Sequence, residues 1–401
     1  MHINNYIISK PIGEHEIQIN SNVYTVLFDQ YNSLGFHYTT SYNQPHYFQD
    51  DTDIEKFKFS LQQTLHQSFT AFLLDTSGSL AVEHAIHYSQ LCTGKSRALK
   101  YRGCYHGSTS ALKDLDNDPL SLPHSTEDAL INAPPFTYEQ SICEITDRLA
   151  TSQYSCIVID PNFCDYFIKV PNWYWMQLRS LCDRFGVFLV FDEMRSGFRC
   201  DQIWFVNQLA IHVDIVVGAK ALSNGLPFSF TAIHERIYNS DLTDEVNKRC
   251  TGFSYNPFII SNSCSVLKTL CTLHSTSSNI STIFKHAAAV HANASIRFHP
   301  RGCSLIITII TDKPVLIAAL CEARLKSEGI LVYRSENKFI LYPHFNMPVD
   351  RLKIILFKFI DIINAVLTSG LTRPPGSITD LVPLNTEYCI NDFEKTEDTH
   401  S

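Results

Sequence analysis

Several features are missing from this sequence, and each absence narrows its function. No apolar run approaches the ~20 residues that a membrane helix requires. The 32 Lys and Arg are outnumbered by 40 Asp and Glu, for a formal net charge of −8, which argues against broad nucleic-acid binding through phosphates. No Gly-x-Gly-x-x-Gly turn follows an apolar strand, and this excludes a nucleotide-binding dehydrogenase. We therefore expect neither a membrane protein nor a nucleic-acid-binding protein.

The cysteines show no disulfide or metal-binding pattern. None of the 13 cysteines has Cys-x-x-Cys spacing, and several lie inside apolar runs, such as Cys156 and Cys182. An odd, unpatterned set is typical of reduced, buried thiols rather than of a disulfide framework. The amino-terminal residues also lack the basic start and apolar core of a signal peptide. These absences predict a soluble, cytoplasmic protein.

Charged residues are scarce, at 18% of the chain against 45% hydrophobic residues. This composition predicts extensive buried surface, and 401 residues leave room for one large α/β domain and a smaller one. Residues 371–401 hold six acidic and two basic side chains, half of the net charge, and we expect a disordered tail there. Residues 1–57 are rich in aromatic residues and are predicted to consist mainly of loops.

Residues 58–280 alternate short apolar runs with helix-sized segments. Because such runs are typical of strands buried on both faces, they predict a mostly parallel sheet flanked by helices. The six expected strands are Ala71–Leu74, Ala98–Tyr101, Cys156–Ile159, Val187–Phe191, Ile215–Val217 and Phe230–Ile233. A second alternation predicts a smaller α+β domain at 281–370, with strands at 305–310, 330–332 and 339–341 and helices at 315–328 and 351–367.

A lysine and an aspartate each follow one of these apolar runs. Asp192 ends the fourth expected strand, and Lys220 lies just after the fifth, before a turn. A charged group at the end of a buried strand is costly unless it has a partner or a covalent role. An amine for an aldehyde and a carboxylate for a pyridinium nitrogen are what pyridoxal phosphate (PLP) needs. The pair indicates this cofactor, with a salt bridge from Asp192 to Arg195 or Arg199 as the alternative.

The first expected strand leads into a segment suited to an anion. Ser77, Gly78 and Ser79 open a helix, where backbone N–H groups and the helix dipole favour a phosphate. The same residue types also suit a simple helix cap. On that helix His84 and His87 share a face, but two histidines without further ligands seldom bind a metal, so no metal site is expected.

The next two strand ends carry further candidates. Tyr105 lies between flexible residues and is suited to stacking on a planar ring or to packing within the loop. His106 is a proton carrier or a hydrogen-bonded structural histidine. Asp160 and Asp165 follow the third strand, and Asp160 equally suits a turn.

In this order, the segments resemble the class III aminotransferases of PLP fold type I, and within that class they are most similar to glutamate-1-semialdehyde aminomutases. The resemblance runs from residue 76 to 257, with weaker similarity at Arg301-Gly302 and Tyr342-Pro343. The matching segments are Thr76–Ser79, Gly103–Gly107, Asp160-Pro161, Phe191–Arg199, Lys220–Pro227 and Phe253–Pro257.

The resemblance implies an aminotransferase that moves an amino group between an amine donor and a carbonyl acceptor. Lys220 would form the aldimine with PLP, and Asp192 would keep the ring nitrogen protonated. Tyr105 and Met194 would pack on the two faces of the ring, and the backbone N–H groups of Gly78 and Ser79 would bind the phosphate. The family also implies a homodimer whose active sites lie at the interface.

The sequence departs from the family pattern in several places. Ser223-Asn224-Gly225 stands where a glycine-rich triplet is usual, and Gly252 aligns with a phosphate-binding threonine of the partner subunit, for which the adjacent Thr251 is a substitute. Tyr255 adds bulk, and Ile340 occupies the place of a carboxylate-binding arginine. These departures argue against an ordinary α-amino acid docked in the usual way. The alternatives are an intramolecular aminomutase and a non-catalytic binding or assembly protein.

Overall fold

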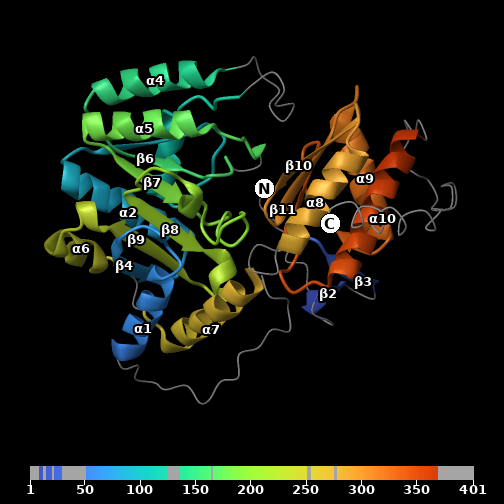
Figure 1. Cartoon of the computed structure of the whole chain (residues 1–401), viewed down its shortest axis with the longest axis horizontal. Helices are drawn as coiled ribbons and strands as arrows, with labels where there is room; N and C mark the ends of the chain where they lie inside the picture. The colour runs from blue at the N-terminus through green and yellow to red at the C-terminus, as the bar shows by residue number, and fades with distance from the viewer. Residues whose placement is uncertain are drawn as a thin grey trace, which may run out of the picture.

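The computed structural model shows two bodies that lie side by side (Figure 1). One contains a six-stranded sheet, and the other contains a four-stranded sheet next to a second, smaller four-stranded sheet. No helix in the part of the chain that the structure describes is both long and apolar enough to cross a membrane. The structure describes residues 9–11, 15–19, 22–28, 51–124, 136–163, 166–250, 254–274 and 278–368.

The six-stranded sheet has the order β4-β9-β8-β7-β6-β5. Strands β5 to β8 pair in parallel, and β9 is antiparallel to both of its neighbours, β8 and β4. Five of the six strands therefore run in one direction, which confirms the predicted mostly parallel sheet. The strands are β4 (Phe69–Asp75), β5 (Arg97–Lys100), β6 (Tyr154–Ile159), β7 (Phe188–Asp192), β8 (Ile215–Ala219) and β9 (Ser229–His234).

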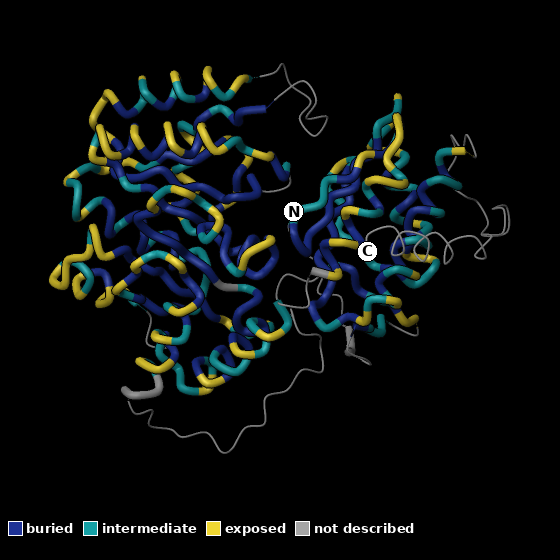
Figure 2. The backbone as a smooth tube through the Cα atoms, viewed as in Figure 1, coloured by how far each residue is buried: buried dark blue, intermediate teal, exposed yellow. Residues whose placement is uncertain are grey.

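Both faces of this sheet are covered by helices, and its strands are largely buried (Figure 2). On β7, Leu189 and Phe191 pack into one apolar core, whereas Val190 packs into another on the opposite face. This alternation follows from the pleat of a strand and explains why the strands are continuously apolar. Helix α2 (Gly78–Thr93) covers one face with α6 (Ser240–Asn247), and the short α3 (Ser110–Lys113) contacts α2. Helices of the opposite core are α1 (Asp51–Gln62), α4 (Tyr138–Ala150), α5 (Asn172–Phe185) and α7 (Pro257–His274).

The second body has an antiparallel sheet in the order β10-β11-β14-β13. The strands expected at 305–310 and 339–341 are present as β11 and β14, and both expected helices are present as α9 and α10. The periodicity did not reveal β10 and β13. The elements are α8 (Ser278–His291), β10 (Ile296–Arg301), β11 (Ser304–Ile309), α9 (Pro314–Ser327), β13 (Tyr333–Ser335), β14 (Lys338–Leu341) and α10 (Val349–Thr368).

The prediction that residues 1–57 are mainly loops is wrong for the described part. Strands β1 (Ser9–Pro11), β2 (Glu16–Ile19) and β3 (Asn22–Val26) form a small sheet, and α1 begins at Asp51. On its other side, β3 pairs in parallel with β12 (Ile330–Leu331), which lies about 300 residues later in the chain. A pairing so remote leaves no local signal. The expected tail at 371–401 lies outside the described residues.

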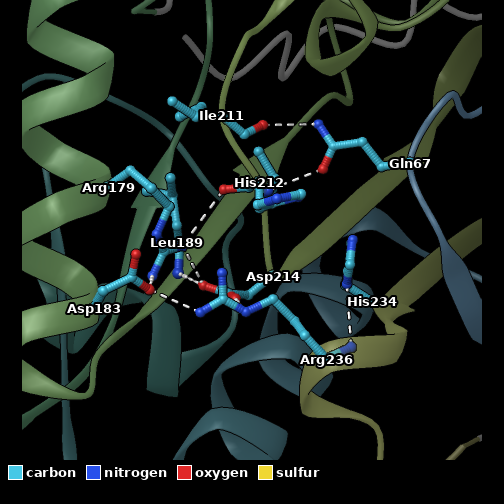
Figure 3. A network of polar contacts seen from close by, with 10 residues as sticks. Gln67, Arg179, Asp183, Leu189, Ile211, His212, Asp214, His234 and Arg236 are labelled. Carbon is cyan, nitrogen blue, oxygen red and sulfur yellow. Dashed lines mark hydrogen bonds and ion pairs between the residues drawn. The ribbon is translucent and has the colours of Figure 1, made fainter.

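A buried ion network joins the amino-terminal ends of β7 and β8 (Figure 3). Asp214, directly before β8, is fully buried. Its Oδ2 lies 2.6 Å from Arg179 Nη1 of α5 and accepts a hydrogen bond from the Leu189 N–H at 2.7 Å. Arg236 lies 3.3 Å from Oδ1, and Asp183 pairs with both arginines from an exposed position. The network links helix α5 to the amino-terminal ends of β7 and β8.

Replacing Asp214 should therefore destabilise the fold strongly. In Asp214→Asn the nearly buried Arg179 loses its charged partner, and removing one partner of a buried pair costs about 3–5 kcal/mol. Asp183→Asn is the matched control, since its side chain is 47% exposed and exposed pairs contribute about 1 kcal/mol or less. Denaturant unfolding of both variants, followed by circular dichroism, measures the difference. Equal losses would contradict this account of the network.

The amino-terminal sheet is attached to the second body through a histidine pair. His15 and His344 are buried, and their Nδ1 atoms lie 2.9 Å apart, so one ring donates the hydrogen bond and the other accepts it. Burial, the neighbouring His344 and Arg351 lower the pKa of His15 to about 4. The neutral form therefore belongs to the folded state.

This arrangement should weaken in acid. Because the folded-state pKa lies below the unfolded value of about 6.5, the contribution of His15 is complete above pH 6.5 and is lost as the pH falls toward 4. We expect the hydrogen-exchange protection factors of β2 and β3, corrected for the intrinsic pH dependence of exchange, to fall between pH 7 and 4.5 in the wild type and to fall less in His15→Gln. The exposed His66 gives the control, His66→Gln. A wild-type profile unchanged by His15→Gln would refute the assignment.

Candidate active site

The carboxyl ends of the parallel strands meet at one edge of the six-stranded sheet and surround a cavity of about 260 Å³. Because β9 runs in the opposite direction, the residues that precede it reach the same edge. Ligands bind at this edge in open α/β sheets. The cavity is lined by residues of six segments: 76–79, 105–107, Asp160, Asp192 with 194–195, Lys220, and 226–228.

Lys220 follows β8, and its side chain lines the cavity. Its φ is +45°, in the left-handed region that a residue with a Cβ seldom adopts. Asn224 and Gly225 also have positive φ, at 45° and 95°. Asn tolerates this region better than other non-glycine residues, so the departure from a glycine-rich triplet is compatible with the turn. Strained backbone of this kind clusters at functional sites.

Asp192 is paired with a histidine rather than with an arginine. Its Oδ2 lies 2.7 Å from His106 Nδ1, and its Oδ1 accepts a hydrogen bond from the Met194 N–H at 3.1 Å. The two arginines expected as alternative partners of Asp192 have other contacts. Arg199 donates to the Pro343 carbonyl, and Arg195 lies within hydrogen-bonding distance of Tyr342 Oη. His106 Nε2 is buried and has no hydrogen-bond partner in the described part of the chain.

Asp160 is the second carboxylate of the cavity. It is 2% exposed, and its Oδ1 accepts a hydrogen bond from the Asn162 N–H at 2.8 Å, as expected for a turn residue. Burial raises the pKa of Asp160, Arg195 lowers it, and the nearby Asp192 raises it further. Asp160 thus serves the turn and also faces the cavity.

The amino terminus of α2 reaches the cavity with residues 77–79. Ser77 is the N-cap, and its Oγ accepts from the Leu80 N–H at 3.3 Å. Ser79 Oγ accepts from the Ser108 N–H at 3.2 Å, which ties the helix to the loop after β5. The first N–H groups of a helix have no acceptor within it, so this end is suited to an anion.

Tyr105 and Met194 are the other two predicted contacts that line the cavity. Tyr105 is 62% exposed, so its ring offers an open face instead of packing into the loop. Met194 is nearly buried, and its Sδ lies 2.8 Å from the position that a Cβ on Gly78 would occupy. A flat group between Tyr105 and Met194 would fill space that the protein leaves open.

Five other residues named from the sequence either lie outside the described residues or are placed elsewhere. Asp165, Thr251 and Gly252 lie outside the described residues. Tyr255 lines a different cavity of about 340 Å³, where its hydroxyl donates to Asn247 Oδ1. Ile340 is fully buried in a small apolar cluster with Phe167, Ile306 and Tyr342, which cannot bind a carboxylate.

The cavity also contains residues that the sequence did not single out. Arg195 was considered only as a partner for Asp192, and Leu226, Pro227 and Phe228 were not assigned. The carboxyl ends of the predicted parallel strands do not include Phe228, which precedes β9, the strand antiparallel to its neighbours in this sheet. A larger cavity of about 690 Å³ lies along α2 and contains neither Lys220 nor Asp192. We therefore place the candidate site in the smaller cavity.

One segment of the second body, Arg301-Gly302, contacts the large body next to the site. Arg301 Nη1 donates to the Pro161 carbonyl at 2.7 Å and to Asn162 Oδ1 at 3.0 Å, next to Asp160. Gly302 has φ +53°, and a Cβ there would lie 2.4 Å from the Arg199 carbonyl oxygen. The weak sequence similarity at Arg301-Gly302 thus corresponds to a close contact between the two bodies.

Comparison with known proteins agrees with this geometry. Residues 40–363 match the family "Aminotransferase class-III", whose members are typically PLP-dependent transferases. The chain is 30% identical over 169 residues to acetylornithine aminotransferase of Methanosarcina acetivorans, covering 40% of this chain and 41% of the relative. It is 29% identical over 207 residues to glutamate-1-semialdehyde 2,1-aminomutase of Wigglesworthia glossinidia brevipalpis, covering 48% and 47%. The chain thus spans less than half the length of these curated relatives.

Solved structures share the fold at low sequence identity. A phospholyase from Arthrobacter in complex with phosphoethanolamine has a TM-score of 0.75 at 18% identity, covering 88% of this chain and 93% of that one. An ω-transaminase from Pseudomonas jessenii in complex with PMP has a TM-score of 0.75 at 14% identity, covering 90% and 93%. At these identities the similarity shows the fold alone.

The loop that carries His106 depends on Gly107. This glycine has φ +141°, and a Cβ there would lie 2.4 Å from Leu112 Cδ1 and 2.9 Å from Ser79 Cβ. Gly107→Ala should therefore displace the loop from α2, destabilise the protein by about 1–3 kcal/mol and weaken binding of PLP. Gly94→Ala is the control, because Gly94 has φ +71° with nothing within 4 Å of the added Cβ. Unfolding and PLP titration compare them, and equal behaviour in both assays would contradict this role.

Proposed function

The chain belongs to the class-III aminotransferase family, and we propose that it is a PLP-dependent aminotransferase that moves an amino group between an amine donor and a carbonyl acceptor. The observation that carries this proposal is the shared cavity of Lys220 and the Asp192–His106 pair. A structural scaffold has no need of a lysine in strained backbone facing a buried carboxylate.

The residues of the cavity fit PLP. The amino terminus of α2 at Gly78 and Ser79 would bind the phosphate, and Tyr105 and Met194 would contact the two faces of the ring. Asp192 would accept a hydrogen bond from the protonated ring nitrogen. The positive charge of the ring would offset the free-energy cost of burying the Asp192 carboxylate.

PLP, when bound, supplies an aldehyde carbon that forms a Schiff base with amines and a pyridinium ring that withdraws electrons. Lys220 would hold the cofactor through its amine Nζ. The same amine, when not bonded to the cofactor, would act as the base that holds and moves the proton of the substrate α-carbon. His106 would hold the Asp192 carboxylate in place through its Nδ1, at 2.7 Å. Asp160 and Arg195 line the same cavity, so their charges would act on a substrate bound there.

We extend the proposal to the organisation of the protein. The large cofactor-binding domain would span 58–280 and the small domain 281–370, as predicted, with the site closed by a second subunit of a homodimer. Thr251 of the partner subunit would then contribute to the phosphate site. The buried free thiols, such as Cys156 and Cys182, support a cytoplasmic location.

An intramolecular aminomutase is the second candidate. The 29% identity to a glutamate-1-semialdehyde 2,1-aminomutase favours it, and the same catalytic groups serve both reactions. An aminomutase isomerises one aminated aldehyde and needs no separate acceptor. The buried, apolar environment of Ile340 argues in either case against a carboxylate bound at that position.

The visible spectrum of the protein with PLP tests the proposal. Wild type should show the band of the lysine-bound cofactor, and borohydride should fix the cofactor covalently. Lys220→Ala should lose the covalent label and about 10³-fold or more of the turnover, because it lacks both the Schiff-base amine and the base. Lys113→Ala, at an exposed position on α3, is the control.

The outcomes separate the candidate functions. Conversion of the bound cofactor to its amine form by simple amine donors supports an aminotransferase, whereas isomerisation of a single aminated aldehyde without an acceptor supports an aminomutase. A folded wild-type protein with no band at saturating PLP would leave the non-catalytic binding or assembly role.

A further inference from the structure

Three potential metal ligands converge outside the candidate active site. Asp75 is the last residue of β4, His84 lies two turns into α2, and Cys250 follows α6. One ligand atom from each lies within 4.8 Å of the others. Asp75 and His84 are buried, and Cys250 is partly buried. The sequence suggested only His84 and His87, because the other two residues come from distant segments.

The spacing of the atoms is close to that of a tetrahedral zinc site. His84 Nδ1 lies 3.1 Å from Asp75 Oδ2 and 3.9 Å from Cys250 Sγ. Zn–N and Zn–O bonds of about 2.0–2.2 Å and a Zn–S bond of about 2.3 Å place N and O ligand atoms about 3.3 Å apart and N and S about 3.6 Å apart. For these two pairs, shifts of a few tenths of an ångström would be sufficient to accommodate an ion, and the ligand atoms of Asp75 and Cys250 lie within 4.8 Å of each other.

The hydrogen bonds around Asp75 leave one of its oxygens available. Oδ1 accepts from the Thr76 N–H at 2.7 Å and from Ser254 Oγ at 3.3 Å. Oδ2 is buried and makes no hydrogen bond of good geometry among the described residues, and it faces His84 Nδ1 at 3.1 Å. Ligating carboxylates are commonly held in this way, with the outer oxygen hydrogen-bonded and the inner one on the metal.

The same geometry argues against a catalytic triad of cysteine, histidine and aspartate. In such a triad the carboxylate and the nucleophile contact different ring nitrogens of the histidine. Here Asp75 and Cys250 both approach Nδ1 of His84. The three atoms thus face a common point and do not form a chain of proton transfer.

We propose that Asp75, His84 and Cys250 bind a divalent transition metal ion, with zinc as the best fit. One thiolate, one imidazole and one carboxylate suit zinc, whereas magnesium and calcium prefer oxygen ligands only. Three protein ligands leave a fourth tetrahedral position for water. Cysteine binds zinc as the thiolate, so binding would release the proton of the Cys250 thiol to solvent.

One member of the cluster also lines a cavity. His84 is one of the residues that line the cavity of about 690 Å³ along α2, together with His87 and Arg249. The cavity is separate from the one that contains Lys220. Water and the ion can therefore reach His84 without passing through the candidate active site.

The position of the cluster indicates what the ion would do. Asp75 directly precedes the Thr76–Ser79 segment, and Cys250 directly precedes Thr251, the two segments proposed to contact phosphate. A metal joining β4, α2 and the segment after α6 would hold both in place. The role is therefore to brace these segments, and it needs no redox step.

Metal analysis of the full-length, reduced protein tests this inference without the cofactor. We expect about one zinc ion per chain after loading, and a competition titration against a chromogenic chelator gives the affinity. Cys250→Ser and His84→Gln should each lose more than about 100-fold in affinity, and Ser254→Ala, which removes a hydrogen bond to Asp75, about 10-fold. The matched controls are His87→Gln, in the same cavity as His84, and Cys92→Ser, on the same helix as His84. Both variants should bind zinc with wild-type affinity.

Cobalt substitution tests the site in the wild type itself, so the test does not depend on how well a variant folds. Wild type loaded with Co²⁺ should show a thiolate charge-transfer band in the near ultraviolet, and folded Cys250→Ser should lose it. Absence of the band in wild type, absence of stoichiometric zinc binding, or equal zinc affinity in wild type, Cys250→Ser and His84→Gln would each overturn the inference. In those cases the three residues form only a hydrogen-bonded buried cluster.

Discussion

The parallel pairing of β5 to β8 is the constraint on which the rest of the structure depends. Parallel strands place every carboxyl end at one edge, so loops from four different parts of the chain must meet there. Asp160, Asp192 and Lys220 become neighbours for this reason alone. The single antiparallel strand, β9, adds the residues before it, including Phe228, to the same edge.

Strand β8 shows how stability and chemistry are separated along one element. At its amino-terminal end Asp214 is neutralised by Arg179 and Arg236 and joins the sheet to its covering helix. At its carboxyl end the chain turns through Lys220 in a strained conformation that lines the cavity. The buried carboxylate at one end has cationic partners within the protein, whereas the site at the other end combines Asp192, Asp160 and a lysine around open space.

The departures from the family pattern have different physical consequences. Asn224 tolerates the positive φ that its turn requires, so the loss of a glycine there is structurally neutral. Ile340 is enclosed by apolar side chains and removes a possible carboxylate contact. The Tyr255 hydroxyl donates to Asn247, and Tyr255 does not line the cavity that contains Lys220. The cluster of Asp75, His84 and Cys250 is a further feature of this chain, and two of its members directly precede segments that we propose to contact the phosphate.

The sequence by itself determined the fold class, the six strands of the large sheet and the residues at their ends, because strand periodicity and turn chemistry are local properties. It also indicated Lys220 and Asp192 as a pair, since both end apolar runs. Only the tertiary structure decided what long-range contacts control: the pairing of β3 with β12, the choice of His106 as the partner of Asp192, and the entry of Arg195 and Phe228 into the cavity. The meeting of Asp75, His84 and Cys250 belongs to the same class, because no periodicity links residues brought together only by the packing of β4, α2 and the segment after α6.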